Sequence, residues 1–123
     1  MIVAGFGFTS RATAASLRDA LAKVIASENA PDCLATLDTK ADAACIQKLH
    51  RETGLDLHPV DRQLARSMAT PTTSAASAAA HGVGSVAEAV ALAAAGPDAV
   101  MVAGRHISDD RQATCALAKG ARS

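Results

Sequence analysis

Three short segments hold most of the residues that could bind a ligand, and each stands at the end of an apolar run. They are residues 5–11 (GFGFTSR), 36–41 (TLDTKA) and 81–89 (HGVGSVAEA). Each pattern is typical of a strand or turn that leads into a helix. In an α/β sheet such turns gather along one edge, where helix N-termini attract anions. The sequence therefore predicts one polar crevice lined by glycine.

Cationic and aromatic side chains accompany these segments. Arg11, Lys40 and Arg105 would supply donors that suit carboxylates, although ordinary solvated surface charges would give the same pattern. Phe6 and Phe8 are the two aromatic residues of the chain. We expect Phe6 in the core. Phe8, at the end of its strand, is expected either in the core or as an apolar platform for a flat ligand.

The motifs of several familiar activities are missing. Residues 5–7 begin like a dinucleotide-binding fingerprint, but Ser10 stands where its third glycine belongs, so a tight strand-to-helix turn is favoured over a nucleotide site. The chain has no Gly-x-Ser-x-Gly elbow, HExxH motif or phosphate loop. His81 and His106 flank the predicted crevice without a partnered carboxylate and give a weak signal for acid–base or metal chemistry. We therefore expect no metal and no cofactor.

Length, composition and charge set further bounds. The 123 residues, half of them hydrophobic, predict one domain over 1–123. A net charge of zero gives no basic face for nucleic acid. The alanine-rich run 86–95 is too short for a bilayer, and the N-terminus lacks the pattern of a signal peptide, so we expect no membrane partner. Cys33, Cys45 and Cys115 stand singly in apolar segments, which indicates reduced thiols in a cytoplasmic protein.

Apolar periodicity predicts an α/β fold in the order βαβαβ, then helices, then a ββ hairpin. We expect a mixed, mostly parallel sheet with helices on both faces. The expected strands are 2–8, 33–37, 55–60, 98–103 and 112–118, with residues 105–111 connecting the last two. The expected helices run from Thr13 to about Ser27, from the turn at 38–40 to about Glu52, after Asp61, over one or two turns at 74–80, and from Ser85 to Ala95.

Capping residues support these helices. Thr13 and Asp61 are expected N-caps, and Gly54 stands where a helix ends. Ser85 and Glu88 form an S-x-x-E pattern, in which the hydroxyl accepts from the N3 amide and the carboxylate reaches back. Gly96-Pro97 would stop that helix.

Taken together, the segments 5–7 (GFG), 34–42 (LATLDTKAD) and 83–92 (VGSVAEAVAL) resemble the cobalamin-biosynthesis family of CobE and the C-terminal domain of CbiG. Their order and spacing match over nearly the whole chain, and the last segment is the most specific. Phe8-Thr9 stands where the family often has Cys-Arg, and Arg105 stands where a lysine is common.

The resemblance implies a role in building the corrin ring, whose intermediates are flat macrocycles carrying many carboxylates. It favours an accessory or carrier module that binds such a precorrin intermediate, because no paired acid and base is visible. An enzyme or enzyme partner in ring contraction or lactone opening stays open, as does a subunit that binds other cobalamin-pathway enzymes. The expected ligand-binding residues are Gly5, Gly7, Phe8, Ser10, Arg11, Asp38, Lys40, Thr70, Thr72, Gly82, Gly84, Ser85 and Arg105.

Overall fold

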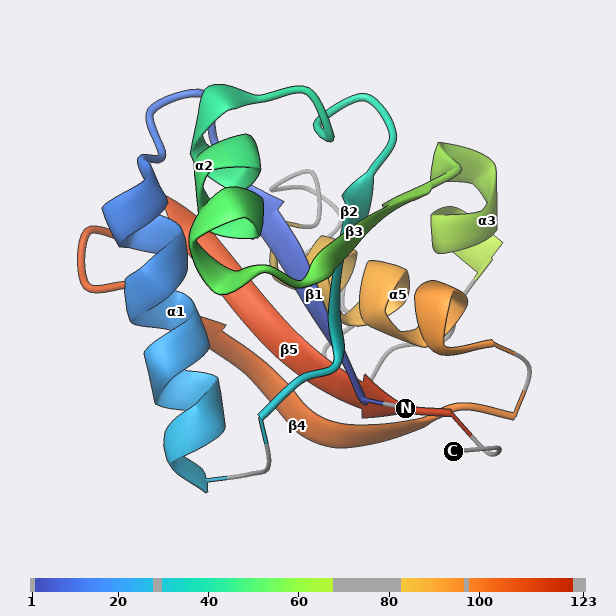
Figure 1. Ribbon diagram of the computed structural model, residues 1–123. Coiled ribbons are helices and arrows are strands. Elements are labelled where there is room, and N and C mark those ends of the chain that lie inside the picture. The colour runs from blue at the N-terminus through green and yellow to red at the C-terminus, as the bar shows by residue number, and fades with distance from the viewer. Residues whose placement is uncertain (1, 28–29, 68–82, 97, 121–123) are drawn as a thin grey trace.

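Nine elements are seen in the computed structural model, which describes all residues except 1, 28–29, 68–82, 97 and 121–123 (Figure 1). In chain order they are β1 (Ile2–Phe8), α1 (Ala14–Ser27), β2 (Cys33–Leu37), α2 (Ala44–Thr53), β3 (Asp56–Val60), α3 (Arg62–Ser67), α5 (Val83–Ala95), β4 (Val100–Ile107) and β5 (Ala113–Lys119). The helical turns expected at 74–80 and the loop at 70–74 lie outside the described residues.

The described strands form one mixed sheet in the order β3-β2-β1-β5-β4. β1, β2 and β3 are parallel, whereas β5 runs antiparallel to both β1 and β4. The predicted fold class and the late hairpin are therefore confirmed. The predicted end of β4 at residue 103 was wrong. The strand continues to Ile107, so Arg105 lies in the strand and not in the connection.

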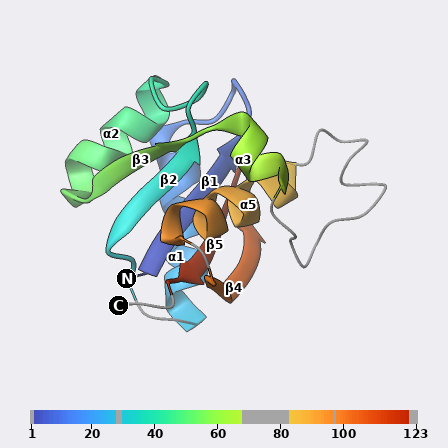
Figure 2. The same ribbon diagram turned by 90° about the vertical axis from the view of Figure 1, so that its right-hand side faces the viewer.

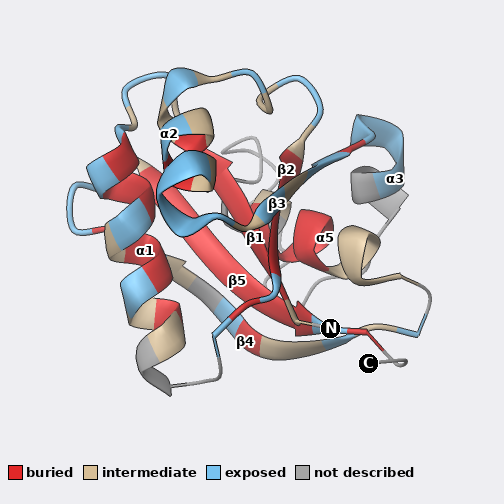
Figure 3. Ribbon diagram, in the orientation of Figure 1, coloured by how far each residue is buried: buried red, intermediate tan, exposed pale blue. Residues whose placement is uncertain are grey.

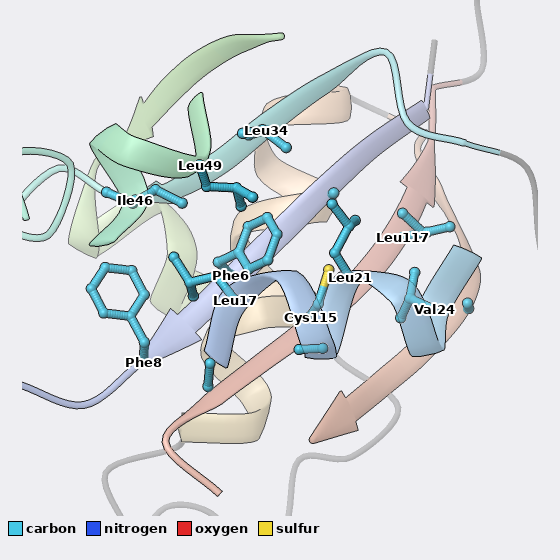
Figure 4. Close-up of a cluster of buried hydrophobic side chains, with 14 residues drawn as sticks. Phe6, Phe8, Leu17, Leu21, Val24, Leu34, Ile46, Leu49, Cys115 and Leu117 are labelled. Atoms are coloured by element: carbon cyan, nitrogen blue, oxygen red, sulfur yellow. The ribbon is translucent and has the colours of Figure 1, made fainter. Parts of the chain in front are cut away.

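Helices cover both faces of the sheet, as expected (Figures 1 and 2). α1 and α2 lie on one face, where Phe6, Leu17 and Leu49 are fully buried in the larger apolar cluster (Figure 4). α5 lies on the other face, over a smaller cluster that includes Val3 and Val90. Burial colouring shows β1 and β5 as the buried centre of the sheet (Figure 3).

The contact of α5 with β1 depends on a glycine. Gly5 is buried in the middle of β1, and a methyl group built on it would lie 2.7 Å from the backbone nitrogen of Ala91 and 2.8 Å from its Cβ. The expected turn at residues 5–7 is therefore wrong. These residues belong to the strand, and the close approach at Gly5 is that of a helix backbone.

Local capping explains where several helices begin and end. Thr13 and Ser16 exchange hydrogen bonds, with Thr13 Oγ1 accepting from the Ser16 amide at 3.3 Å, so Thr13 caps α1 as predicted. Asp61 Oδ1 accepts from the amides of the first turn of α3. Gly54 closes α2 in the left-handed conformation, with φ of 71°.

The predicted capping box at Ser85 and Glu88 was wrong. α5 begins at Val83, so Ser85 is its third residue and not its N-cap. Glu88 is the sixth residue of the helix and is fully buried. Its Oε2 faces Gly104 of β4, 3.5 Å from where a Cβ on that glycine would lie. One extra helical turn thus changes the role of both residues.

Candidate functional site

Two segments follow the carboxyl ends of neighbouring parallel strands, and we call the surface that they form the carboxyl edge. They are residues 9–12 after β1 and residues 38–43 after β2. The second segment is held by the Asp38 amide, which donates to the Val60 carbonyl at 2.8 Å, and by the Lys40 amide, which donates to the Leu37 carbonyl at 2.9 Å. Crevices outside the carboxyl ends of strands are the usual ligand sites of open α/β sheets.

The segment after β1 is fixed by the late hairpin. The Thr9 amide donates to the Gln112 carbonyl at 2.9 Å, and the two side chains are also hydrogen-bonded. Thr9 Oγ1 accepts from the Arg11 amide at 3.2 Å. Ser10 and Arg11 are exposed. The backbone is thus held while the Arg11 side chain faces solvent.

The hairpin turn is itself fastened to α1. Asp110 accepts hydrogen bonds from the hydroxyls of Ser108 at 2.6 Å and Ser16 at 2.5 Å. These bonds lower the pKa of Asp110, that from Ser108 most strongly, because they stabilise its charged form. Lys23 pairs with Asp109 at 2.6 Å nearby. Sequence reasoning missed this connection, because Ser16 and Asp110 are far apart in the chain.

Phe8 and Lys40 contact each other across the two strands. Phe8 is buried, with 7% of its surface exposed, and stands at the end of β1 beside Leu17 and Ile46 (Figure 4). The Lys40 ammonium lies over its ring, 5.4 Å from the centroid, within the range of a cation–π contact. Of the two positions expected for Phe8, the structure shows the one in the core and not an open apolar platform, and a cationic side chain lies over the ring.

The start of α2 lies next to Lys40. Its N-cap is Ala43, which makes no side-chain capping hydrogen bond. Ala43 therefore offers no side-chain acceptor to the N–H groups of this first turn, and the helix dipole gives that end a partial positive charge. Burial raises the pKa of the Cys45 thiol, whereas hydrogen bonds from the Ile46 and Cys45 amides and, least of all, the Lys40 charge act in the opposite direction.

The N-terminus of α5 points to the same edge. The chain leaves α5 at Ala95 and enters β4 at Val100, which pairs with Lys119, the partner of Ile2. The C-terminus of α5 therefore lies at the Ile2 end of the sheet, and its first turn, with the backbone of Gly84 and Ser85, lies toward the Phe8 end.

The expected site residues are thus divided among several places. Ser10, Arg11, Asp38 and Lys40 lie on the carboxyl edge, and Phe8 lies beneath it. Gly5 and Gly7 are buried in β1, and the Gly7 carbonyl accepts a hydrogen bond from Thr114 Oγ1 at 3.2 Å. Arg105 belongs to the edge strand β4, which β5 separates from β1. Thr70, Thr72 and Gly82, together with His81, lie outside the described residues.

Three other features of the described part of the chain concern metal sites, reactive histidine and cysteine side chains, and membrane spans. No group of three or more His, Cys, Asp and Glu side chains there could hold a metal ion. His106 Nδ1 is within hydrogen-bonding distance of the Gly104 carbonyl, at 2.9 Å. The cysteines are free thiols, and burial raises the pKa of Cys115 strongly. No described helix is long and apolar enough to cross a membrane.

Comparison with known proteins shows the family to which this chain belongs. The model of the family described as cobalamin synthesis G C-terminus matches residues 2–118. The chain belongs to this family. The resemblance predicted from the sequence is therefore confirmed.

Two solved structures of cobalamin biosynthesis proteins are similar to this chain. The cobalamin biosynthesis protein chiG from Agrobacterium tumefaciens is 31% identical, with a TM-score of 0.76, and the match covers 98% of this chain and 99% of that one. CobE, a protein from the cobalamin biosynthetic pathway, is 27% identical, with a TM-score of 0.77, over 96% and 89% of the two chains.

A third solved structure shows the same fold within a longer chain. It is a putative cobalamin biosynthesis protein G homolog from Sulfolobus solfataricus, 20% identical with a TM-score of 0.73. The match covers 99% of this chain but 37% of that one. A search of curated proteins found no match.

Proposed function

We propose that this chain is a cytoplasmic accessory or carrier module of cobalamin biosynthesis, which binds a corrin-ring intermediate at the carboxyl edge. One observation carries the proposal: Arg11 and Lys40 follow the ends of adjacent parallel strands, with the Phe8 ring beneath Lys40. A corrin intermediate combines a flat apolar ring with peripheral carboxylates. The edge combines an aromatic ring with cations, which is the matching set of groups.

The backbone supports the same ligand class. The first turns of α2 and α5 both lie toward this edge, and the N-cap of α2, Ala43, has no side-chain acceptor for the N–H groups there. Helix N-termini favour anions, and carboxylates bound there would add hydrogen bonds to the charge attraction of Arg11 and Lys40. These groups bind and neutralise charge, which suits a protein that holds or hands on an intermediate.

Titration of the protein with hydrogenobyrinic acid, a corrin with free side-chain carboxyl groups, tests the proposal. We expect saturable binding with a spectral shift and without a new product. Arg11→Ala should weaken binding roughly tenfold, because a charge-assisted hydrogen bond contributes about 1.5–3 kcal/mol and 1.4 kcal/mol is a tenfold change. Raising the salt should weaken wild-type binding more than Arg11→Ala binding.

Lys119→Ala is the matched control. Lys119 is exposed at the opposite end of the sheet, where it pairs with Ile2, so its loss should leave affinity within about twofold. Equal affinities for wild type, Arg11→Ala and Lys119→Ala would contradict binding at the carboxyl edge. Formation of a new corrin product by the pure protein would instead favour an enzyme.

A further inference from the structure

We infer that Lys40 is a two-position specificity residue: without ligand its ammonium covers Phe8, and with ligand it leaves the ring to pair with a corrin carboxylate. The inference rests on the proposed function and names the class of corrin selected, namely one whose side-chain carboxyl groups are free and not amidated.

Phe8 is buried at the end of β1. Its ring closes the outer end of the cluster on the α1 and α2 face, yet 7% of its surface is exposed. Lys40, itself half-buried, is the residue whose ammonium lies over that ring. An aromatic ring at the end of a strand is thus closed from solvent partly by a flexible side chain.

The contact by which Lys40 covers Phe8 is weak. A cation–π contact contributes little at an exposed site, and lysine has several rotatable bonds by which its ammonium can leave without any movement of the backbone. The backbone of Lys40 is meanwhile fixed on both sides: its amide donates to Leu37 and its carbonyl accepts from Ala43 at 3.0 Å. The side chain can therefore move while the turn stays in place.

Lys40 in these two positions would distinguish an acidic corrin from an amidated one. A corrin carboxylate placed by the first turn of α2 would meet the Lys40 ammonium and would replace the ring as its partner. An amidated corrin carries no charge there and would have to displace Lys40 without a replacement contact. The same residue thus favours an acidic corrin and opposes an amidated one, which combines attraction with exclusion.

Lysine NMR in the free protein provides the first test. The chain has four lysines and two phenylalanines, so the ε-methylene signals are few and Lys40→Arg assigns that of Lys40. We expect the Lys40 signal upfield of the other three, because it lies over an aromatic ring, and we expect Phe8→Leu to abolish that difference. Saturation with dicyanocobyrinic acid should move the Lys40 signal to the range of the other lysines.

Affinities for two matched corrins provide the second test. Dicyanocobyrinic acid has free carboxyl groups, whereas dicyanocobinamide has the same ring and metal with those groups amidated. Lys40→Ala should bind the acid at least about tenfold more weakly and the amide about two- to fivefold more tightly, the latter from loss of the cover. Lys40→Arg should keep the preference of wild type for the acid.

The outcomes separate the two hypotheses. Binding of the acid with an unmoved Lys40 signal, or an equal loss of both affinities in Lys40→Ala, would overturn the two-position role and leave the proposed function standing. A wild-type protein that binds neither corrin would overturn the proposed function and this inference with it.

Discussion

The two faces of the sheet are built in different ways. On the α1 and α2 face, large side chains such as Phe6, Leu17 and Leu49 fill the space between sheet and helices. On the α5 face, backbone meets backbone, because Gly5 lets Ala87 and Ala91 lie directly on β1. The first face should tolerate changes that keep its volume, whereas the second leaves no room for an added atom at Gly5. The same close contact fixes where the first turn of α5 reaches the carboxyl edge.

The largest effect expected from this difference is that of Gly5→Ala. The added methyl would overlap backbone atoms of α5, which cannot move aside as a side chain would, so we expect a loss of about 3 kcal/mol or more in the free energy of unfolding. Gly104→Ala is the control, because its methyl would meet Glu88 Oε2 at 3.5 Å, an ordinary contact. Urea denaturation measures both, and equal stability of the two variants would refute the close approach of the α5 backbone at Gly5.

The starts of the helices on the two faces provide a second, smaller contrast. Thr13→Ala removes a capping hydroxyl from α1 and should cost about 1 kcal/mol. Ser85→Ala, in the first turn of α5 but after its N-cap, should change stability by less than about 0.5 kcal/mol. Thermal and urea unfolding of both variants checks this. A loss at Ser85 as large as that at Thr13 would restore the capping role that its position in α5 removes.

A pH-dependent effect is expected where the hairpin meets α1. The lowered pKa of folded Asp110 stabilises the protein above the ordinary Asp pKa of about 3.9, and this contribution is lost as the pH falls toward the lowered value. Asp110→Asn and Ser16→Ala should therefore lose less stability between pH 6 and pH 3 than wild type does. The urea midpoints of the three proteins, measured across this pH range, test this expectation. Parallel pH profiles for all three would contradict a stabilising role of the Asp110 carboxylate.

Much of the architecture could be predicted from the sequence, because local signals and tertiary packing agree. Three local signals are confirmed in the structure: β-branched residues begin β1, Thr13 caps α1 and Gly54 ends α2. β4 was harder, since Arg105 and His106 look like a polar connection. The pairing of His106 with Cys115 keeps them in the ladder instead.

The candidate site was predicted only in part. The positions of Arg11 and Lys40 follow from parallel strands whose ends share one edge. The cover on Phe8 could not be predicted, because it depends on which way a flexible lysine side chain points. The burial of Glu88 was missed, because the S-x-x-E pattern was interpreted as a capping box, whereas α5 begins at Val83 and places Glu88 within the helix, fully buried.

The central claim, that a corrin binds at the carboxyl edge, is tested most directly by mapping amide chemical shifts while hydrogenobyrinic acid is added to the labelled protein. We predict saturable shifts for the amides of Ser10, Arg11 and Lys40, and none at the opposite end of the sheet, around Asp32 and Lys119. Shifts that gather at that opposite end, or that leave Arg11 and Lys40 unmoved while ligand binds, would contradict the account.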